Sequence, residues 1–203
     1  MEDRQALTVS SSASALPVWD EVDARLLDVA SDLIASRGTG GFTIAELARD
    51  ARVSRPTIYR RWPGTDEVVR AALLRQTVSI IARMAPDVRT GHELVAEVMR
   101  FSELFRDDRV FGRLLDREPE VFTQYSLERI GSSQRAMLRW LEVAIARGQA
   151  GGTVREGAAG DMSVMLLLIV QSAVLSRQAV SSLIGASEWH RELTRAVEGY
   201  LLP

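Results

Sequence analysis

The spacing of apolar residues is helical along nearly the whole chain. From Trp19 onward, apolar side chains recur every three or four positions, as they do on one face of an α-helix. The first such stripe consists of Leu26, Leu27, Ala30, Leu33 and Ile34. No segment alternates apolar and polar residues with the period of two that a half-buried strand requires. The pattern therefore predicts an all-α fold.

Breaks in this pattern divide the chain into three parts. Residues 1–18 are rich in Ser and Ala and lack a helical period, which predicts a flexible N-terminal arm. Residues 19–64 form a head of three helices that ends at Pro63-Gly64, and residues 65–203 form a larger helical body. The helices expected in the body cover residues 65–84, 92–106, 123–147, 158–183 and 187–201, with a broken region through Phe111, Leu115 and Pro119.

The composition excludes several classes of protein. All 25 cationic residues of the 203 are Arg, and Cys is absent, so disulfides, Cys-ligated metals and thiol nucleophiles are excluded. The longest apolar run, Val164 to Val170, is far shorter than the roughly 20 residues of a membrane span. The N-terminus has no cationic start followed by an apolar stretch, so no secretory signal is expected. We therefore expect a cytoplasmic protein without a membrane partner.

Two short helices in the head carry clear start signals. Thr43 precedes Glu46 by three residues, which is the spacing of a capping box. Ser54 is placed to cap the next helix, and Pro56 falls in its first turn, where a missing N–H is tolerated. Ala48 is small enough to let the two helices cross closely. This arrangement predicts a helix-turn-helix, whose second helix enters a DNA major groove.

Positive charge is concentrated on the same hairpin. Residues 33–64 contain six Arg against Glu46 and Asp50, a local sum of +4, whereas the whole chain sums to −2. The rest of the chain therefore carries −6. A local basic patch on an acidic protein is the electrostatic pattern expected for contact with phosphates. The alternative is an ordinary hairpin that exposes its Arg side chains to water.

Three runs of residues in this hairpin match a known signature. They are Thr43-Ile44-Ala45-Glu46-Leu47-Ala48, Val53-Ser54 and Thr57-Ile58-Tyr59-Arg60-Arg61-Trp62. Together they resemble the DNA-binding motif of the tetracycline-repressor (TetR) family of bacterial regulators, over about the first third of the chain. The resemblance implies a homodimer that binds double-stranded DNA at a palindromic operator and releases it when a small molecule enters the body.

The first turn of the second helix is expected to read bases. Ser54 caps this helix, and its exposed amides can also meet a phosphate. Arg55, Pro56 and Thr57 follow at the end of the helix that reaches base edges. Arg55 can pair with guanine, and the methyl group of Thr57 can contact a thymine methyl.

Other polar residues of the hairpin are expected to contact the DNA backbone. Tyr59 resembles the phosphate-contacting tyrosine of the family. We expect Arg60 and Arg61 to bind phosphates rather than bases, and Thr43 can do so as a helix cap.

Two positions depart from the family pattern. Arg52 stands in the turn, where relatives commonly have Gly, and it costs about 1 kcal/mol if the turn needs a positive φ. Either the turn differs slightly, or Arg52 is tolerated because it contacts a phosphate. Thr65 stands where relatives usually have a DNA-contacting Lys, and Arg61 is our candidate to replace that contact.

The C-terminal helices have the pattern of a subunit interface. Residues 164–175 are apolar almost all round, and such a helix must be buried on every side. We expect two helices from each subunit to form a four-helix interface, whose candidate residues are Leu168, Leu175, Leu193, Val197 and Tyr200. A buried helix in a monomer core is the alternative.

Aromatic and Met side chains of the body could line a ligand pocket, although such residues taken singly are more often plain core. The candidate ligand-binding residues are Phe101, Phe105, Met137, Trp140, Met165 and Gln171. Because few polar groups accompany them, a mostly apolar effector is expected, such as a lipid-like acid or a hydrophobic drug. No cofactor or metal is expected.

An enzyme is not expected. His92 and His190 are the only histidines and lie far apart, and the chain has no Gly-rich phosphate loop or nucleophile elbow. The sequence favours a ligand-responsive regulator, most simply a repressor. The competing hypothesis is a helical interaction module whose basic hairpin binds an acidic protein.

Overall fold

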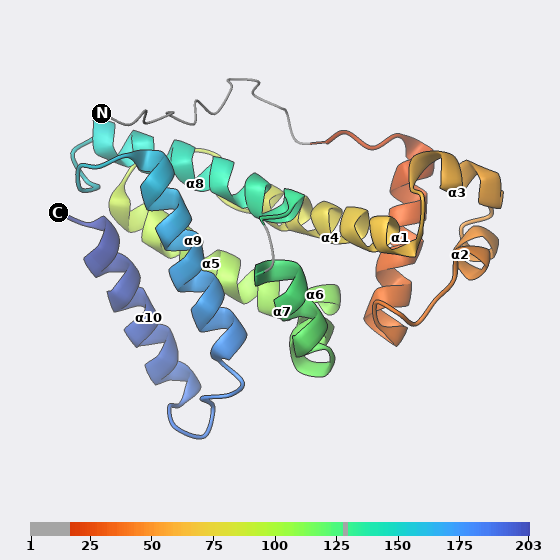
Figure 1. Ribbon diagram of the computed structural model, residues 1–203. Helices are drawn as coiled ribbons and strands as arrows, with labels where there is room; N and C mark the ends of the chain where they lie inside the picture. Colours follow the sequence, from red (N-terminus) through yellow and green to blue (C-terminus); the bar gives the residue numbers. More distant parts are fainter. Residues whose placement is uncertain (1–16, 128–129) are drawn as a thin grey trace, which may run out of the picture.

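The structure is a computed structural model that describes residues 17–127 and 130–203. These residues form ten α-helices and no strand, so the predicted all-α fold is confirmed (Figure 1). The helices are α1 (Glu21–Arg37), α2 (Ile44–Asp50), α3 (Arg55–Arg61), α4 (Thr65–Ala82), α5 (Gly91–Asp107), α6 (Arg109–Arg117), α7 (Pro119–Leu127), α8 (Ser132–Ala150), α9 (Ala159–Ser176) and α10 (Ala186–Leu201). The expected N-terminal arm lies almost entirely outside the described residues.

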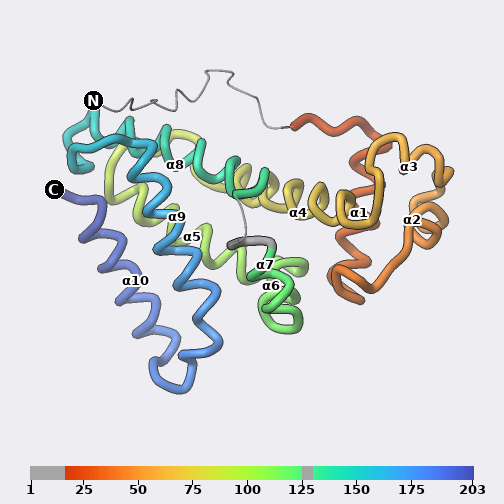
Figure 2. Tube along the Cα trace, in the orientation of Figure 1, coloured from red at the N-terminus to blue at the C-terminus, as the bar shows by residue number. Residues whose placement is uncertain are grey.

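Helices α1, α2 and α3 gather at one end of the molecule, and α4 leads from them toward the other end (Figure 1). The tube in Figure 2 shows α5, α8, α9 and α10 at that far end, with α6 and α7 between the two groups. Helix α1 packs along α4 and α6, α8 packs against α4 and α9, and α10 packs against α5 and α9. The first three helices are therefore attached to the rest mainly through α1.

One long helix that the sequence predicted is in fact two helices. One helix was predicted over residues 123–147, but α7 ends at Leu127 and α8 begins at Ser132. Gly131 starts α8, and its N–H donates to Oε1 of Gln134, 2.9 Å away. This contact resembles a capping box and supplies a local start signal that the apolar period alone does not reveal.

The region expected to be broken is also helical. Asp108 begins α6 by accepting hydrogen bonds from the N–H groups of Val110 and Phe111, at 2.9 and 3.0 Å. Pro119 is the first residue of α7, a position where proline is favoured. Two short helices with a sharp junction therefore replace the predicted irregular segment.

Helix α9 is shorter than predicted and unusually apolar. It ends at Ser176 rather than near residue 183, and turns follow, in which Ser181 Oγ donates to the carbonyl of Gln178. By length and hydropathy α9 could cross a membrane, although it packs against α5, α8 and α10. Only 28% of its residues are buried within one chain, which leaves much of this apolar helix uncovered.

Candidate DNA-binding surface and ligand cavity

The start signals predicted for α2 and α3 are present. Thr43 Oγ1 accepts from the N–H of Glu46 at 3.2 Å, and Glu46 Oε2 accepts from the N–H of Thr43 at 2.9 Å. This reciprocal contact is the predicted capping box, and it lowers the pKa of Glu46 chiefly through the Thr43 backbone donor. Ser54 Oγ accepts from the N–H of Thr57 at 3.3 Å and caps α3.

The turn between α2 and α3 is a Schellman motif. The N–H of Val53 donates to the carbonyl of Ala48 at 3.0 Å, and the N–H of Arg52 donates to that of Arg49 at 3.2 Å. Arg52 has φ of 56°, in the left-handed region that favours glycine. The turn therefore keeps the conformation that glycine adopts easily, and Arg52 carries the strain.

Helix α3 presents a polar face to solvent and an apolar residue to the core. Ile58 is fully buried, whereas Arg55, Pro56, Arg60 and Tyr59 are exposed, Tyr59 by 53%. The first turn of the helix, where base readers are expected, is thus open to a partner.

The arginines of the basic hairpin fall into two groups. Arg37 pairs with Glu46 at 3.1 Å, and Arg49 pairs with the neighbouring Asp50 at 2.9 Å. Within the described part of the chain, Arg52, Arg55 and Arg60 have no hydrogen bond or ion pair. The positive charge that is available to a partner therefore lies in the turn and on α3.

Arg61 belongs to the paired group, and its predicted phosphate contact would have to compete with the carboxylates that already bind it. Its guanidinium binds the carboxylates of Asp20, at 2.9 Å, and Asp23, and its side chain is only 19% exposed. These hydrogen bonds raise the pKa of Arg61, with Asp20 the larger cause. Arg61 therefore fastens the end of α3 to the start of α1, which leaves it poorly placed to replace the Lys contact that Thr65 lacks.

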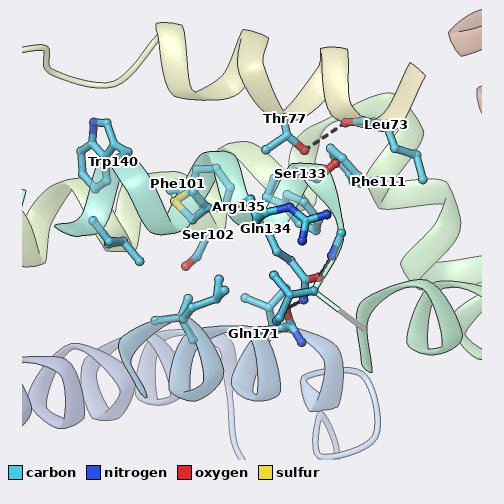
Figure 3. Close-up of a pocket in the computed structure, with 18 of the residues that line it drawn as sticks. Leu73, Thr77, Phe101, Ser102, Phe111, Ser133, Gln134, Arg135, Trp140 and Gln171 are labelled. Carbon is cyan, nitrogen blue, oxygen red and sulfur yellow. Dashed lines mark hydrogen bonds between the residues drawn. The ribbon is translucent and has the colours of Figure 1, made fainter. Parts of the chain in front are cut away.

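A cavity of about 540 Å³ lies between the helices of the body. Aromatic side chains from α5, α6 and α7 form one wall: Phe105 stacks on Phe111 with ring centroids 4.0 Å apart, and Phe122 lies 5.8 Å from Phe105. Leu73 and Thr77 come from α4, and Trp140 comes from α8 (Figure 3).

Polar groups gather near the start of α8. Nε2 of Gln134 donates to Oε1 of Gln171 at 2.9 Å, which joins α8 to α9 across the cavity. Figure 3 shows Ser133 and Arg135 close to this pair, whereas Trp140 and Phe101 lie farther along the cavity. The site is thus a mainly apolar space with polar groups toward one end.

Five of the six predicted ligand residues line this cavity: Phe101, Phe105, Met137, Trp140 and Gln171. Met165 does not line it, because its side chain is 47% exposed on another face of α9. The wall contributed by Leu73 and Thr77 was missed by sequence reasoning. Both residues fit the ordinary apolar pattern of α4, and only the packing of that helix on α8 identifies them as lining.

The predicted interface residues occupy several different environments, and Leu175 lines the cavity. Leu193 and Val197 are buried inside a single chain, where α10 packs on α5 and α9. Leu168 on α9 is instead 41% exposed. Val164 and Met165 of α9 and Val143 of α8 are also exposed. The uncovered apolar face therefore lies on α8 and α9 rather than on α9 and α10.

Comparison with known proteins agrees with this geometry. The family model described as bacterial regulatory proteins of the tetR family matches residues 26–72, which span the capped hairpin. An uncharacterised HTH-type transcriptional regulator of Mycobacterium tuberculosis is 32% identical over 177 residues, covering 87% of this chain and 93% of that protein. The similarity extends well beyond the DNA-binding motif into the body.

Two solved structures share the fold. The regulator FadR of Bacillus subtilis, in complex with stearoyl-CoA, has a TM-score of 0.61 at 16% identity and covers 88% of this chain and 97% of its own. A transcriptional regulator from Saccharomonospora viridis, in complex with choline, has a TM-score of 0.58 at 18% identity and covers 90% and 98%. The capped hairpin, the helical body and the curated relative together place this chain in the TetR family: it is a DNA-binding transcriptional regulator of the helix-turn-helix type and not an enzyme.

Proposed function

We propose that this regulator is a repressor that binds a palindromic operator as a homodimer and is released by a mostly apolar effector. The DNA-binding part of this proposal rests on one observation: some arginines of the hairpin are paired with carboxylates and others are not. Arg52, Arg55 and Arg60 are unpaired within the described residues, whereas their neighbours are held by carboxylates. Unpaired cations around an open helix N-terminus match the charge and geometry of a DNA backbone beside a major groove.

Each contact follows from the position of its residue. Arg55 in the first turn pairs with guanine, and Thr57 offers its methyl group to thymine because its hydroxyl is already bonded to that of Ser54, 2.7 Å away. Arg52, Arg60 and Tyr59 contact phosphates. Thr43 and Ser54 assist as caps at the two helix starts.

The exposed apolar face of α8 and α9 supplies the dimer contact in this proposal. Val164 and Leu168 are one helical turn apart on α9, and Val143 is exposed on α8, which packs beside it. Exposed apolar side chains on two adjacent helices favour burial against a second copy with twofold symmetry. Such a dimer would present two reading helices to half-sites about 34 Å apart, one turn of DNA.

The aromatic wall of the cavity supports an apolar effector. The two structural relatives bind stearoyl-CoA and choline, so the shared fold does not determine ligand chemistry. In this chain, four Phe and one Trp line the cavity, and apolar side chains form most of the rest. In this proposal, residues 19–64 are the DNA-binding head. Residues 65–203 are the body, which binds the effector and forms the dimer, and the protein is cytoplasmic.

Selection of bound duplexes from a random pool tests DNA recognition and symmetry together. We expect a palindromic motif whose half-site centres are one helical turn apart. Affinity for the recovered duplex should exceed that for a shuffled duplex of equal length by a factor on the order of 10³ or more. Equal affinity for both duplexes would overturn the proposal and favour an acidic protein partner for the hairpin.

A thermal-shift series tests the effector. Long-chain carboxylates and hydrophobic drugs should raise the melting temperature and release the recovered duplex, whereas sugars and amino acids should do neither. The Met137→Trp variant, which places a larger side chain in the cavity, should weaken the response to the apolar compounds. A response to the polar compounds alone would contradict an apolar effector.

A further inference from the structure

Glu118 lies at the junction between two helices that wall the cavity. Its N–H donates to the carbonyl of Leu114 in α6, and its own carbonyl accepts from the N–H of Phe122 in α7, both at 3.0 Å. Phe111, seven residues earlier on α6, and Phe122, four residues later on α7, both line the cavity. The backbone of Glu118 therefore directly links the two helices that carry these rings.

The side chain of Glu118 reaches out of the body to the loop between α1 and α2. Its Oε2 accepts hydrogen bonds from the N–H of Thr39 at 3.1 Å and from Oγ1 of Thr39 at 2.7 Å. Among the described residues, no other body side chain forms a hydrogen bond with residues 38–42. Thr43, which starts α2, is only four residues beyond this contact.

Gly38 makes this approach possible. Its φ of 93° is unfavourable for other residues, and a Cβ atom built on it would lie 1.9 Å from Oε1 of Glu118. Any side chain at this position would collide with the carboxylate. The end of α1 is thus shaped around the carboxylate of Glu118.

Arg113 offers a second partner to the same carboxylate. Its Nε already forms an ion pair with Oε1 of Glu118 at 3.7 Å, a separation too long for a hydrogen bond. That nitrogen is buried and has no hydrogen-bond partner. A buried unsatisfied donor is unfavourable, so a shift of α6 that closed the gap would stabilise a different position of Glu118.

We propose that Glu118 is the coupling residue between cavity and DNA-binding head, with Thr39 and Arg113 as alternative partners. With Phe111 and Phe122 edge to face, their ring centroids 6.1 Å apart, the carboxylate holds Thr39 and fixes the α1–α2 loop. A molecule that parts Phe111 from Phe122 shifts the α6–α7 junction, Glu118 turns to Arg113, and the loop that leads into α2 is released. The regulatory role of this contact rests on the proposed effector response, whereas the contact itself can be tested without effector or DNA.

Amide hydrogen exchange of the full-length protein tests this coupling, with the Thr39 N–H as the probe. Phe122→Ala removes the cavity wall that is joined to Glu118, and Met137→Ala enlarges the same cavity from α8 as the matched control. Exchange of the amides of residues 26–34 in α1 reports global unfolding, and it is used to correct the Thr39 exchange of both variants for their changes in overall stability. We expect Phe122→Ala to raise corrected exchange at Thr39 about tenfold or more, as for the loss of one charge-assisted hydrogen bond, and Met137→Ala to leave it unchanged.

A second pair of variants tests the alternative partners. Glu118→Gln should raise exchange at Thr39 by itself. Arg113→Met removes the rival donor, so adding it to Phe122→Ala should reduce the increase that Phe122→Ala produces alone. Equal exchange at Thr39 in Phe122→Ala and Met137→Ala, or an undiminished increase in the double variant, would overturn the coupling. A failed duplex selection would count against operator binding and leave these exchange results standing.

Discussion

The reading surface of the head and the cavity of the body are built in opposite ways. Within the described part of the basic hairpin, the unpaired cations that make up the reading surface are Arg52, Arg55 and Arg60, on one turn and one short helix. The cavity takes its walls from residues as far apart as Leu73 and Leu175, on six helices. The first site is therefore a local property of the sequence, and the second is a product of helix packing.

The two sites also differ in how function relates to stability. Side chains of the reading surface are exposed and contribute little to the core, so changing them should alter affinity rather than folding. Side chains of the cavity wall are part of the core, so changing them should alter folding first. Substitutions that separate affinity from stability can test this contrast directly.

The largest effect is expected in the cavity wall. Phe111 is almost fully buried and stacks on Phe105, so Phe111→Ala should lower the free energy of unfolding by about 3–5 kcal/mol. Urea unfolding measures this change. Leu183→Ala, at an 83% exposed position, is the control and should stay within about 0.5 kcal/mol of the parent. Folded Phe111→Ala protein should prefer the same operator sequence as the parent. A change in the preferred sequence would show that the cavity wall also determines DNA recognition.

On α3 we expect the opposite: a change in DNA binding without a change in stability. Arg55→Ala should weaken operator binding by roughly 1–3 kcal/mol and relax selectivity at one position, with stability unchanged. Fluorescence anisotropy with operator variants measures both. Arg49→Ala is the control, because its guanidinium is already paired with Asp50 and should contribute little to DNA binding. Uniform weakening on all duplexes by Arg55→Ala would instead assign Arg55 to a phosphate.

The same contrast explains what the sequence could predict. The capping box of Thr43 and Glu46 and the Ser54 cap were identified because their signals span only three or four residues. The ion pairs of Arg61 were not identified from the sequence, because its partners Asp20 and Asp23 are about forty positions away. A local pattern identifies a cation, but it does not show whether a distant carboxylate already binds it.

The sequence also could not show which neighbour covers each apolar helix face, because those neighbours are distant in the chain. The stripe on the last helix predicted an interface, yet Leu193 and Val197 bury against neighbouring helices of the same chain. Periodicity shows that a face must be covered without showing what covers it. Met165 illustrates the same limit, since an apolar residue on α9 could equally face the cavity or the exterior.

Substitution of Arg52 should change both the stability of the protein and its affinity for DNA. Its φ of 56° is a conformation that glycine adopts without strain, so Arg52→Gly should raise the free energy of unfolding, by about 1 kcal/mol. It should also weaken DNA binding on every sequence and reduce the salt-dependence slope by about 1, as expected for one lost phosphate contact. Denaturant unfolding and salt titrations of binding measure the two effects. Greater stability with unchanged DNA binding would show that Arg52 contacts no phosphate.

The smallest effect is expected from an exposed carboxylate that joins α1 to α3. The pKa of Asp20 is lowered below 3.8, first because its carboxylate accepts the N–H of Asp23 and then because Arg61 donates to it. Unfolded chains have the ordinary pKa and take up the proton first as pH falls. The stabilisation is therefore complete above pH 3.8 and is lost as pH falls through the lowered value of the folded state.

Asp20→Asn tests this linkage while keeping a good helix cap. The variant loses the ion pair with Arg61, so it should be less stable than the parent near neutral pH, and the difference should shrink as pH falls below 3.8. Urea unfolding at a series of pH values measures this convergence. Glu156→Gln, at an exposed carboxylate that is unpaired within the described residues, is the control and should show no such trend. A stability difference that stays constant down to pH 3 would mean that Asp20 acts only as a neutral cap and that its ion pair with Arg61 adds no stability.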